Sequence, residues 1–388
     1  MGSRLHTLLL FTTLQFILTT VFWGQNRKAE QIINQKIKEI GRYEIKENGL
    51  YSFSVAMGYG SSDILGKLNS FKDIGATIDR IDLIYTDFPK GANLSELNLN
   101  RLKQIETFHP ILIQNPLIKW NIVCQTACQT EEEARTFFHG IVIYYQLYTT
   151  PEYIKVVKNN LMSYLPEKVN NQIAKEMMDT MRKPVVNKVF NRNKNWKNAV
   201  LIVDLTTSMI PYNSQVLLWQ LLHSERSFFK DVILFNDGDS APEEAKKVGK
   251  TGGIYHEKNI SFDALRKTSI NVCQNGVGNS DFPENDLEAV LFAINQVPNA
   301  EEYILIADND APPRDMALLD KINRPIRIVL CDTENGILPQ YLEVARRTGG
   351  SVHTIDEDLT ALMVKKEGEV FIAGGRKYKI TGGKIKVL

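Results

Sequence analysis

One short stretch of the chain combines residue types that bind hard metal ions. Asp204, Thr206 and Ser208 alternate with other residues. They follow the apolar run 198–203 and precede Pro211, a pattern that predicts a strand leading into a helix. At such a turn one carboxylate and two hydroxyls project from a short arc of backbone. This all-oxygen donor set suits a hard divalent cation, Mg²⁺, Ca²⁺ or Mn²⁺, and not a soft one.

Further acids follow other apolar runs in the second half of the chain. Asp308 comes directly after the run 303–307, and Asp281 lies in a glycine-rich loop that leads into a helix-like segment. Ligands of open α/β sheets bind at the carboxyl ends of the strands, so we expect these acids to lie near the first loop. The predicted metal ligands are Asp204, Thr206, Ser208, Asp281 and Asp308.

Each of these residues also has an interpretation without a metal. Asp, Thr and Ser commonly cap the N-termini of helices, and Asp281 precedes a helix-like segment in the same way. Asp310 is expected to face solvent. The acidic stretch 236–239 lacks the twelve-residue spacing and closing Glu of a calcium loop, so we predict a turn there. The scattered histidines offer no pair at zinc-ligand spacing.

The elements that must position these residues form a strand–helix alternation. Apolar runs without period-two alternation are typical of parallel strands buried on both faces, and they occur at 200–203, 232–235, 303–307 and 326–330. Helical spacing lies between or after them, at 216–223, 287–296 and 341–348. We therefore predict an α/β fold whose doubly wound, mostly parallel sheet is flanked by helices, over residues 198–362.

The rest of the chain divides into four shorter parts. Residues 27–148 alternate strand and helix signals and predict a smaller α/β domain of unknown role. Residues 149–197 predict a helical connector, and 363–388 predict a β-hairpin extension that turns at two Gly-Gly pairs. Residues 1–24 combine a short polar start with an apolar run, as in a signal peptide or an N-terminal anchor. The protein is thus expected to be exported, to the periplasm or cell envelope, either secreted or N-terminally anchored, and to meet a membrane only through an uncleaved leader.

Composition narrows the classes of partner. The chain has 388 residues with 46 basic and 45 acidic ones, a net charge of +1, and no basic stripe stands out. We therefore expect no nucleic-acid partner. Export permits disulfides, and Cys124 and Cys128 are close enough to pair if the residues between them turn. Cys331 ends an apolar run and is expected to be a buried, small apolar residue.

Taken in order, four landmarks resemble the von Willebrand factor type A family. The triplet within 204–208 matches the family's metal-ion-dependent adhesion site (MIDAS) motif, and 278–284 is similar to its second motif loop in bacterial members. Asp308 matches the third motif acid, and 342–350 resembles the last helix and turn. The resemblance covers residues 196–362. The longer pattern, which adds the stretches 235–239, 251–255 and 314–315, is similar to exported von Willebrand A-type proteins of Bacteroidetes bacteria.

Two residues depart from the family pattern. Thr207 stands where Gly is usual, and Asp281 stands where integrin-type members place a metal-coordinating Thr. The added negative charge should tighten metal binding but reduce the need for an acidic group from a partner.

The resemblance implies a non-enzymatic, metal-dependent protein-binding or adhesion module, in which an acidic side chain of the partner completes the coordination. Two alternatives remain at this point. The protein is a structural envelope scaffold whose site is empty or only stabilising, or it is a metal-dependent hydrolase. The absence of a histidine close in sequence to the acidic loops counts against the hydrolase.

Overall fold

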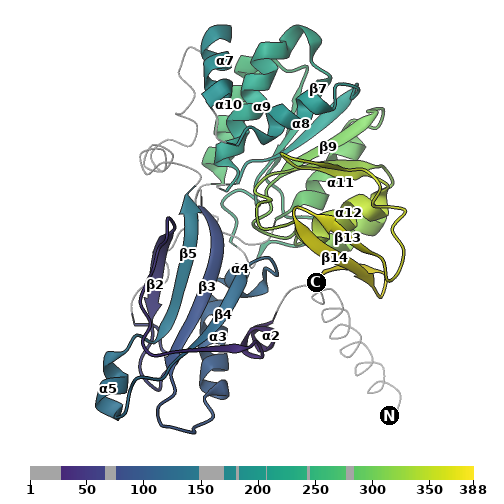
Figure 1. The fold of residues 1–388 in the computed structure, drawn as a ribbon. Coiled ribbons are helices and arrows are strands. Elements are labelled where there is room, and N and C mark those ends of the chain that lie inside the picture. Colours follow the sequence, from purple (N-terminus) through teal and green to yellow (C-terminus); the bar gives the residue numbers. More distant parts are fainter. Residues whose placement is uncertain are drawn as a thin grey trace, which may run out of the picture.

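The computed structural model describes residues 28–65, 76–147, 170–180, 183–206, 208–242, 245–276 and 284–388. These residues form an α/β protein with a five-stranded, a seven-stranded and a three-stranded sheet (Figure 1). The leader predicted over 1–24 and the predicted ligand Asp281 lie outside the described residues. No helix within the described ranges is long and apolar enough to cross a membrane.

The largest sheet has the strand order β12-β11-β10-β9-β6-β7-β8. Only the two edge strands, β8 and β12, run antiparallel to their neighbours. The four predicted strands are confirmed as β6, β7, β9 and β10, whereas the edge strands β8 and β12 and the short β11 were not predicted. The strands are β6 (Ala199–Asp204), β7 (Phe229–Phe235), β8 (Ile254–Lys258), β9 (Glu302–Ala307), β10 (Ile326–Leu330), β11 (Ser351–His353) and β12 (Asp358–Leu359).

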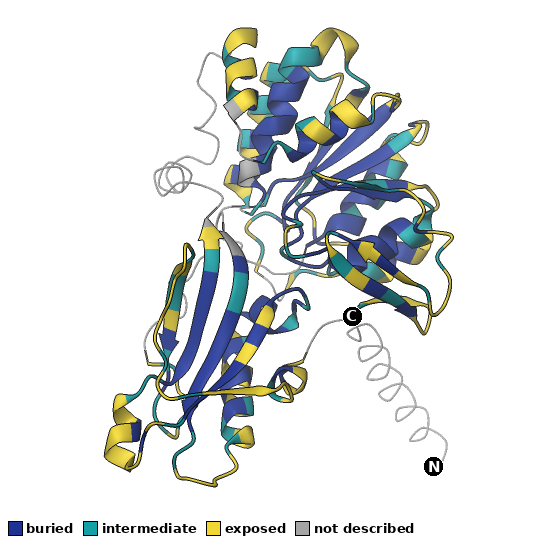
Figure 2. Cartoon of the chain, viewed as in Figure 1, coloured by how far each residue is buried: buried dark blue, intermediate teal, exposed yellow. Residues whose placement is uncertain are grey.

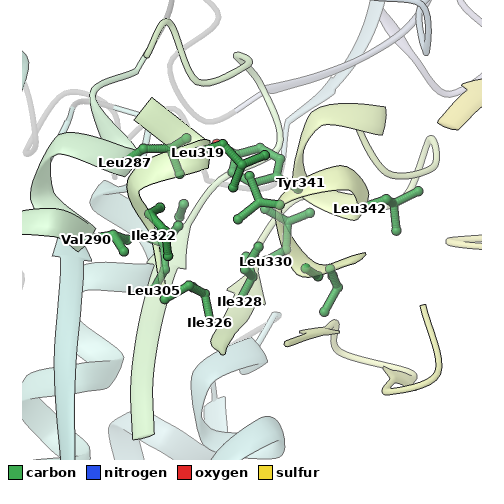
Figure 3. Close-up of a cluster of buried hydrophobic side chains, with 14 of the residues drawn as sticks. Leu287, Val290, Leu305, Leu319, Ile322, Ile326, Ile328, Leu330, Tyr341 and Leu342 are labelled. Carbon is green, nitrogen blue, oxygen red and sulfur yellow. The ribbon is translucent and has the colours of Figure 1, made fainter. Parts of the chain in front are cut away.

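Helices cover both faces of this sheet, as the unbroken apolar runs predict. Val200 and Ile202 of β6 pack on the side of α11 (Asp286–Gln296) and α12 (Pro339–Thr348). Figure 3 shows this cluster, in which side chains of α11 and α12 meet those of β9 and β10. The alternate residues of β6 pack on the other side, against α9 (Ile210–His223) and α10 (Phe262–Asn275). The three predicted helices are confirmed as α9, α11 and α12.

Part of the predicted connector belongs to the same core. The helices α7 (Asn171–Thr180) and α8 (Val185–Arg192) pack on α9 and bury residues such as Val189. Gln215 of α9 fixes the start of α8, because its amide oxygen accepts from the Val186 N–H at 3.0 Å and its amide nitrogen donates to the Lys183 carbonyl at 2.8 Å. The described part of the connector is therefore built into the second half of the molecule.

The N-terminal sheet has the order β1-β4-β3-β5-β2 and mixes parallel and antiparallel pairs. Helices cover one face, where Ile81, Leu83 and Tyr85 of β3 are buried. The other face of β3 is also buried at Ile84, which belongs to a second, smaller apolar cluster. The elements are α2 (Ala29–Ile33), β1 (Ile37–Ile40), β2 (Tyr51–Ala56), β3 (Ala76–Thr86), α3 (Ser95–Phe108), α4 (Pro110–Gln114), β4 (Lys119–Gln125), α5 (Glu131–Thr136) and β5 (Gly140–Leu147).

The C-terminal sheet is an antiparallel meander of β13 (Val370–Ala373), β14 (Arg376–Thr381) and β15 (Lys384–Val387). The turns fall at the two Gly-Gly pairs, as predicted. Figure 2 shows the alternation of buried and exposed residues along these strands. The sheet also touches the N-terminal half, because the Arg376 guanidinium donates to the Leu117 carbonyl at 2.7 Å.

The four cysteines are buried, unpaired thiols, so the structure contains no Cys124–Cys128 disulfide. The Cys128 sulfur lies 3.9 Å from a carboxylate oxygen of Asp87. Cys331 is fully buried in the core next to α9, which confirms its expected role as a small apolar residue.

Candidate metal centre

The candidate site lies where the strand order of the large sheet reverses. After β6 the chain adds β7 and β8 on one side and then returns to add β9 on the other. Asp204 is the last residue of β6, and Asp308 directly follows β9, the adjacent parallel strand. Ligands of open α/β sheets bind at such reversal points, beyond the carboxyl ends of the strands. The topology therefore brings two of the predicted ligands together.

The first loop directs its polar groups into a compact arrangement. The Thr206 N–H donates to Oδ1 of Asp204 at 2.7 Å, which closes a short turn. The hydroxyl oxygens of Thr206 and Ser208 lie 3.2 Å apart. Asp204 is fully buried, whereas Thr206 and Ser208 are half-buried. The loop thus has a closed carboxylate end and an open hydroxyl end.

The hydroxyls do not cap the helix that follows. The N-cap residue of α9 is Met209, and no side chain accepts a capping hydrogen bond there. The capping interpretation of Thr206 and Ser208 is therefore wrong for α9. Among the described residues the Asp204 carboxylate accepts a hydrogen bond only from the Thr206 N–H, and its second oxygen accepts none.

Asp308 is held by its own loop. It is buried, and its Oδ1 accepts from the Asp310 N–H at 2.9 Å. Asp310 is half-exposed, in keeping with the expectation that it faces solvent. The neighbouring Asn309 is buried, and its side chain bonds to the backbone of the segment 332–338. Asp308 therefore sits on a well-fixed backbone.

Four further buried acids were missed as site residues. Asp237 follows β7, Glu284 and Asp286 flank the start of α11, and Asp315 lies before a short 3₁₀ helix (Met316–Lys321). Glu284 is fixed by its backbone, which bonds to Pro312 and Arg314. Acids at the start of a helix usually lie in solvent, where they complement the helix dipole. There was therefore no reason in the sequence to expect these acids to be buried. The strand-end position of Asp237 was the one sequence clue, and it had been assigned to a turn.

Negative charges concentrate around Asp204. Burial, and next the charges of Asp308 and Asp237, raise the pKa of the Asp204 carboxyl well above its ordinary value. Burial and the charges of Asp237 and Asp204 raise the pKa of Glu284 in the same way. The pKa of Asp286 is also raised, by burial and then by Asp315, although a hydrogen bond from Tyr341 opposes the shift. The site is therefore a region of strongly negative potential inside the protein.

Several oxygens of this group have no partner within the described ranges. They are buried and accept no hydrogen bond, and they include Oδ2 of Asp204, Oε2 of Glu284 and Oδ1 of Asp286. No lysine or arginine in the described part of the chain forms an ion pair with Asp204, Glu284 or Asp286. A buried carboxylate without a donor or a counter-charge is costly, so this arrangement favours either protonation or a cation.

The donor set fits a hard cation through oxygens alone. Within the described residues no three His, Cys, Asp or Glu side chains are arranged as metal ligands. The predicted set contains only two such groups there, Asp204 and Asp308, because its other described members are the hydroxyls of Thr206 and Ser208. Asp281 lies outside the described ranges. The orphaned oxygen of Asp204 and the adjacent hydroxyls are the features that a divalent ion would satisfy.

A scan against protein-family models, a search of the curated proteins and a search of the solved structures each found no match. The fold and the site therefore define the class of this chain by themselves. It is an α/β protein with a mostly parallel seven-stranded sheet whose carboxyl edge holds a buried, acidic, oxygen-rich site.

Proposed function

We propose that this chain is an exported, von Willebrand factor A-type protein that binds a divalent cation and, through it, an acidic group of a protein partner. The proposal makes no use of catalysis. The described residues that would hold the cation are Asp204, Thr206, Ser208 and Asp308, and Asp281 belongs to the same predicted set. When bound, the cation supplies a positive charge in a pocket of carboxylates.

One observation carries the proposal: the second carboxylate oxygen of Asp204 is buried and accepts no hydrogen bond from any residue that the structure describes. The first oxygen is already used by the Thr206 N–H, so the side chain cannot turn away without breaking that bond. Leaving a buried acceptor such as this oxygen unsatisfied costs about 1–3 kcal/mol. A cation next to the Thr206 hydroxyl would remove this penalty, as protonation would at low pH.

The asymmetry of the site supports a partner rather than a cation sealed in the core. Asp204 and Asp308 are buried, whereas Thr206 and Ser208 are half-buried. A ligand from another protein can therefore approach on the hydroxyl side. An acidic group of a partner would bind to the cation from this side, because the hydroxyls there are neutral and the carboxylates of Asp204 and Asp308 lie on the buried side.

Isothermal titration calorimetry of the metal-stripped chain tests the metal half of the proposal. We expect one site for Mg²⁺, Ca²⁺ or Mn²⁺. Asp204→Asn should abolish binding, and Ser208→Ala should weaken it at least tenfold, since even groups behind the ligands matter that much. The matched control is Asp231→Asn, which removes a β7 carboxylate that bonds His256 and lies near the other end of the strand. The absence of binding, or equal losses in Asp204→Asn and Asp231→Asn, would refute it.

A second titration tests the partner half. Metal-loaded protein is mixed with a pool of short peptides that contain glutamate, and with the same pool in which glutamine replaces glutamate. We expect binding only of the glutamate pool, and loss of that binding in EDTA or in Asp204→Asn. If metal binds but the glutamate pool is not preferred, the cation only stabilises the fold. The protein would then be interpreted as a structural scaffold and not as an adhesive module.

A further inference from the structure

The outer surface of the C-terminal sheet carries a concentration of lysines that the linear sequence did not reveal. Strand alternation sends every second residue outward, and on β14 and β15 those residues are four lysines and Thr381. On β13 the outward residues are aliphatic. We call this surface the basic face, and it consists of Val370, Ile372, Lys377, Lys379, Lys384 and Lys386.

The opposite face of the same sheet is apolar and packed. Phe371, Tyr378, Ile380 and Ile385 are buried and join the core beside α12. Figure 1 shows β13 and β14 lying over α12 at the side of the molecule. The sheet is therefore firmly attached, and its outer face is presented to the surroundings as a rigid surface.

Charge is distributed unevenly along the chain. Residues 363–388 contain seven basic and two acidic residues, a net charge of +5, although the whole chain carries only +1. Both acids are already engaged. Glu367 accepts the N–H groups of Gly382 and Gly383 at the turn, and Glu369 pairs with Lys365 at 2.6 Å. They therefore do not neutralise the lysines of β14 and β15 by contact.

The lysines of the basic face lack such partners. None of the four forms an ion pair within the described ranges. Lys379 lies directly opposite Lys386 across the β14–β15 pair, and like charges in that position destabilise a sheet. The two positive charges repel each other in the free protein, and binding to an anionic surface would offset that repulsion.

Aliphatic side chains extend the basic face on its outer edge. Val370 is 50% and Ile372 is 63% exposed, and both belong to β13, which pairs only with β14. Exposed aliphatics on an edge strand promote aggregation unless something covers them. Met363 and Val364, in the segment just before β13, are exposed as well. Aliphatic groups beside lysines match a lipid surface, where the chains enter the interface and the ammonium groups reach the headgroups.

We propose that the basic face docks on the surface of an anionic phospholipid bilayer. The four lysines contact headgroup phosphates, and Val370 and Ile372 enter the interface between headgroups and acyl chains. An acidic protein would match the lysines but would gain less from a flat row of exposed aliphatics. Stable attachment to a membrane usually needs two weak signals, and the basic face supplies one that is independent of the apolar run predicted in the leader.

Flotation with lipid vesicles tests this proposal on the full chain. Vesicles of phosphatidylcholine alone are compared with vesicles that contain 30% phosphatidylglycerol. The test variant carries Lys377→Gln, Lys379→Gln, Lys384→Gln and Lys386→Gln. The matched control loses four exposed lysines elsewhere, through Lys188→Gln, Lys194→Gln, Lys258→Gln and Lys267→Gln. Any contribution of the apolar leader to binding is the same for both kinds of vesicle and for all variants. The difference in binding between the two kinds of vesicle therefore reports the effect of lipid charge alone.

We expect tighter binding to the anionic vesicles, reduced by high salt. Each lysine near the surface contributes about fivefold in partition coefficient, so the test variant should lose at least tenfold and the control variant little. Val370→Thr with Ile372→Thr should weaken binding severalfold at constant charge. Thermal unfolding of the test variant should match the parent, because three of the replaced side chains are exposed and Lys379 is only partly buried.

Three outcomes would overturn the proposal. The first is equal binding of the parent to both vesicle types, and the second is an equal loss in the test and control variants. The third is displacement of the parent from vesicles by polyglutamate or duplex DNA, when the competitor is added at a lower concentration of negative charges than the lipid provides. That result would identify an acidic protein or a nucleic acid as the partner.

Discussion

Replacing Asp204 by asparagine is expected to reverse the way in which divalent cations affect the stability of the fold. Asparagine keeps the oxygen that accepts from the Thr206 N–H and removes the negative charge from a fully buried position. Its amide also places a donor where the orphaned Oδ2 of Asp204 lies. The parent should be less stable than Asp204→Asn in EDTA, and more stable than Asp204→Asn in saturating Mg²⁺ or Ca²⁺.

The size of both effects follows from the structure and from linkage. Relief of one unsatisfied buried oxygen is worth about 1–3 kcal/mol, which sets the advantage of Asp204→Asn in EDTA. A cation at 1,000 times its dissociation constant stabilises the parent by about 4.1 kcal/mol, which exceeds that advantage. In a folding unit of 150–250 residues, that corresponds to a rise in Tm of about 8–16 °C. Asp204→Asn should show no such rise.

Thermal unfolding followed by circular dichroism is the assay, with EDTA and each cation compared at pH 7 and constant ionic strength. Asp231→Asn serves as the control and should keep the full cation-dependent rise in Tm. The reasoning is refuted if no cation shifts the Tm of the parent. It is equally refuted if Asp204→Asn keeps the shift, because the cation would then bind elsewhere.

Two further predictions concern parts of the fold away from the metal centre. Burial lowers the pKa of His353, and although burial alone would raise the pKa of Asp358, hydrogen bonds from Arg192 and His353 lower it. Both groups bind fewer protons in the folded state than in the unfolded state, so their contribution to stability is lost as the pH falls from about 7 toward 3. Urea unfolding at pH 7.5 and 5.5 should therefore show a smaller loss of the free energy of unfolding in His353→Gln than in the parent. Tyr378→Phe should lower the free energy of unfolding by about 1–3 kcal/mol, because its hydroxyl accepts from the Ile337 N–H and donates to the Ile337 carbonyl, both buried; an unchanged urea midpoint would contradict this.

The central part of the large sheet was predictable because its strands are buried on both faces. Apolar runs such as 303–307 leave no alternative to a buried strand, and β9 begins within one residue of the prediction. The edge strand β8 was missed because its residues are half-buried and include charged ones, as at an edge that faces solvent. The short β11 and β12 were missed because two or three residues give no period to detect.

The site was predictable only as far as strand ends reveal it. Asp204 and Asp308 stand directly after apolar runs, so their convergence follows from a parallel sheet. Glu284, Asp286 and Asp315 gave no such signal, because acids near helix starts are usually solvated. Their burial depends on tertiary contacts, such as the hydrogen bond from Tyr341 to Asp286, that no local pattern encodes. The same limit hid the basic face, whose lysines gather only when the β14–β15 hairpin brings alternate residues of two strands together.

The segment 332–338 links the candidate metal centre to the rest of the molecule. Beside Asp308, the Asn309 amide donates to the carbonyls of Asp332 and Gly336 and accepts from the Leu338 N–H, so it bonds this segment at three points. The same segment bonds the C-terminal sheet through Ile337 and Tyr378. It reaches the N-terminal sheet through the Asn335 amide, which donates to the Ile78 carbonyl at 2.7 Å. The position of Asp308 is therefore set by a backbone that both flanking sheets help to hold. A metal ligand needs such support, because its geometry is only as precise as the groups behind it. The N-terminal and C-terminal sheets thus help to hold the backbone of the candidate metal centre in place.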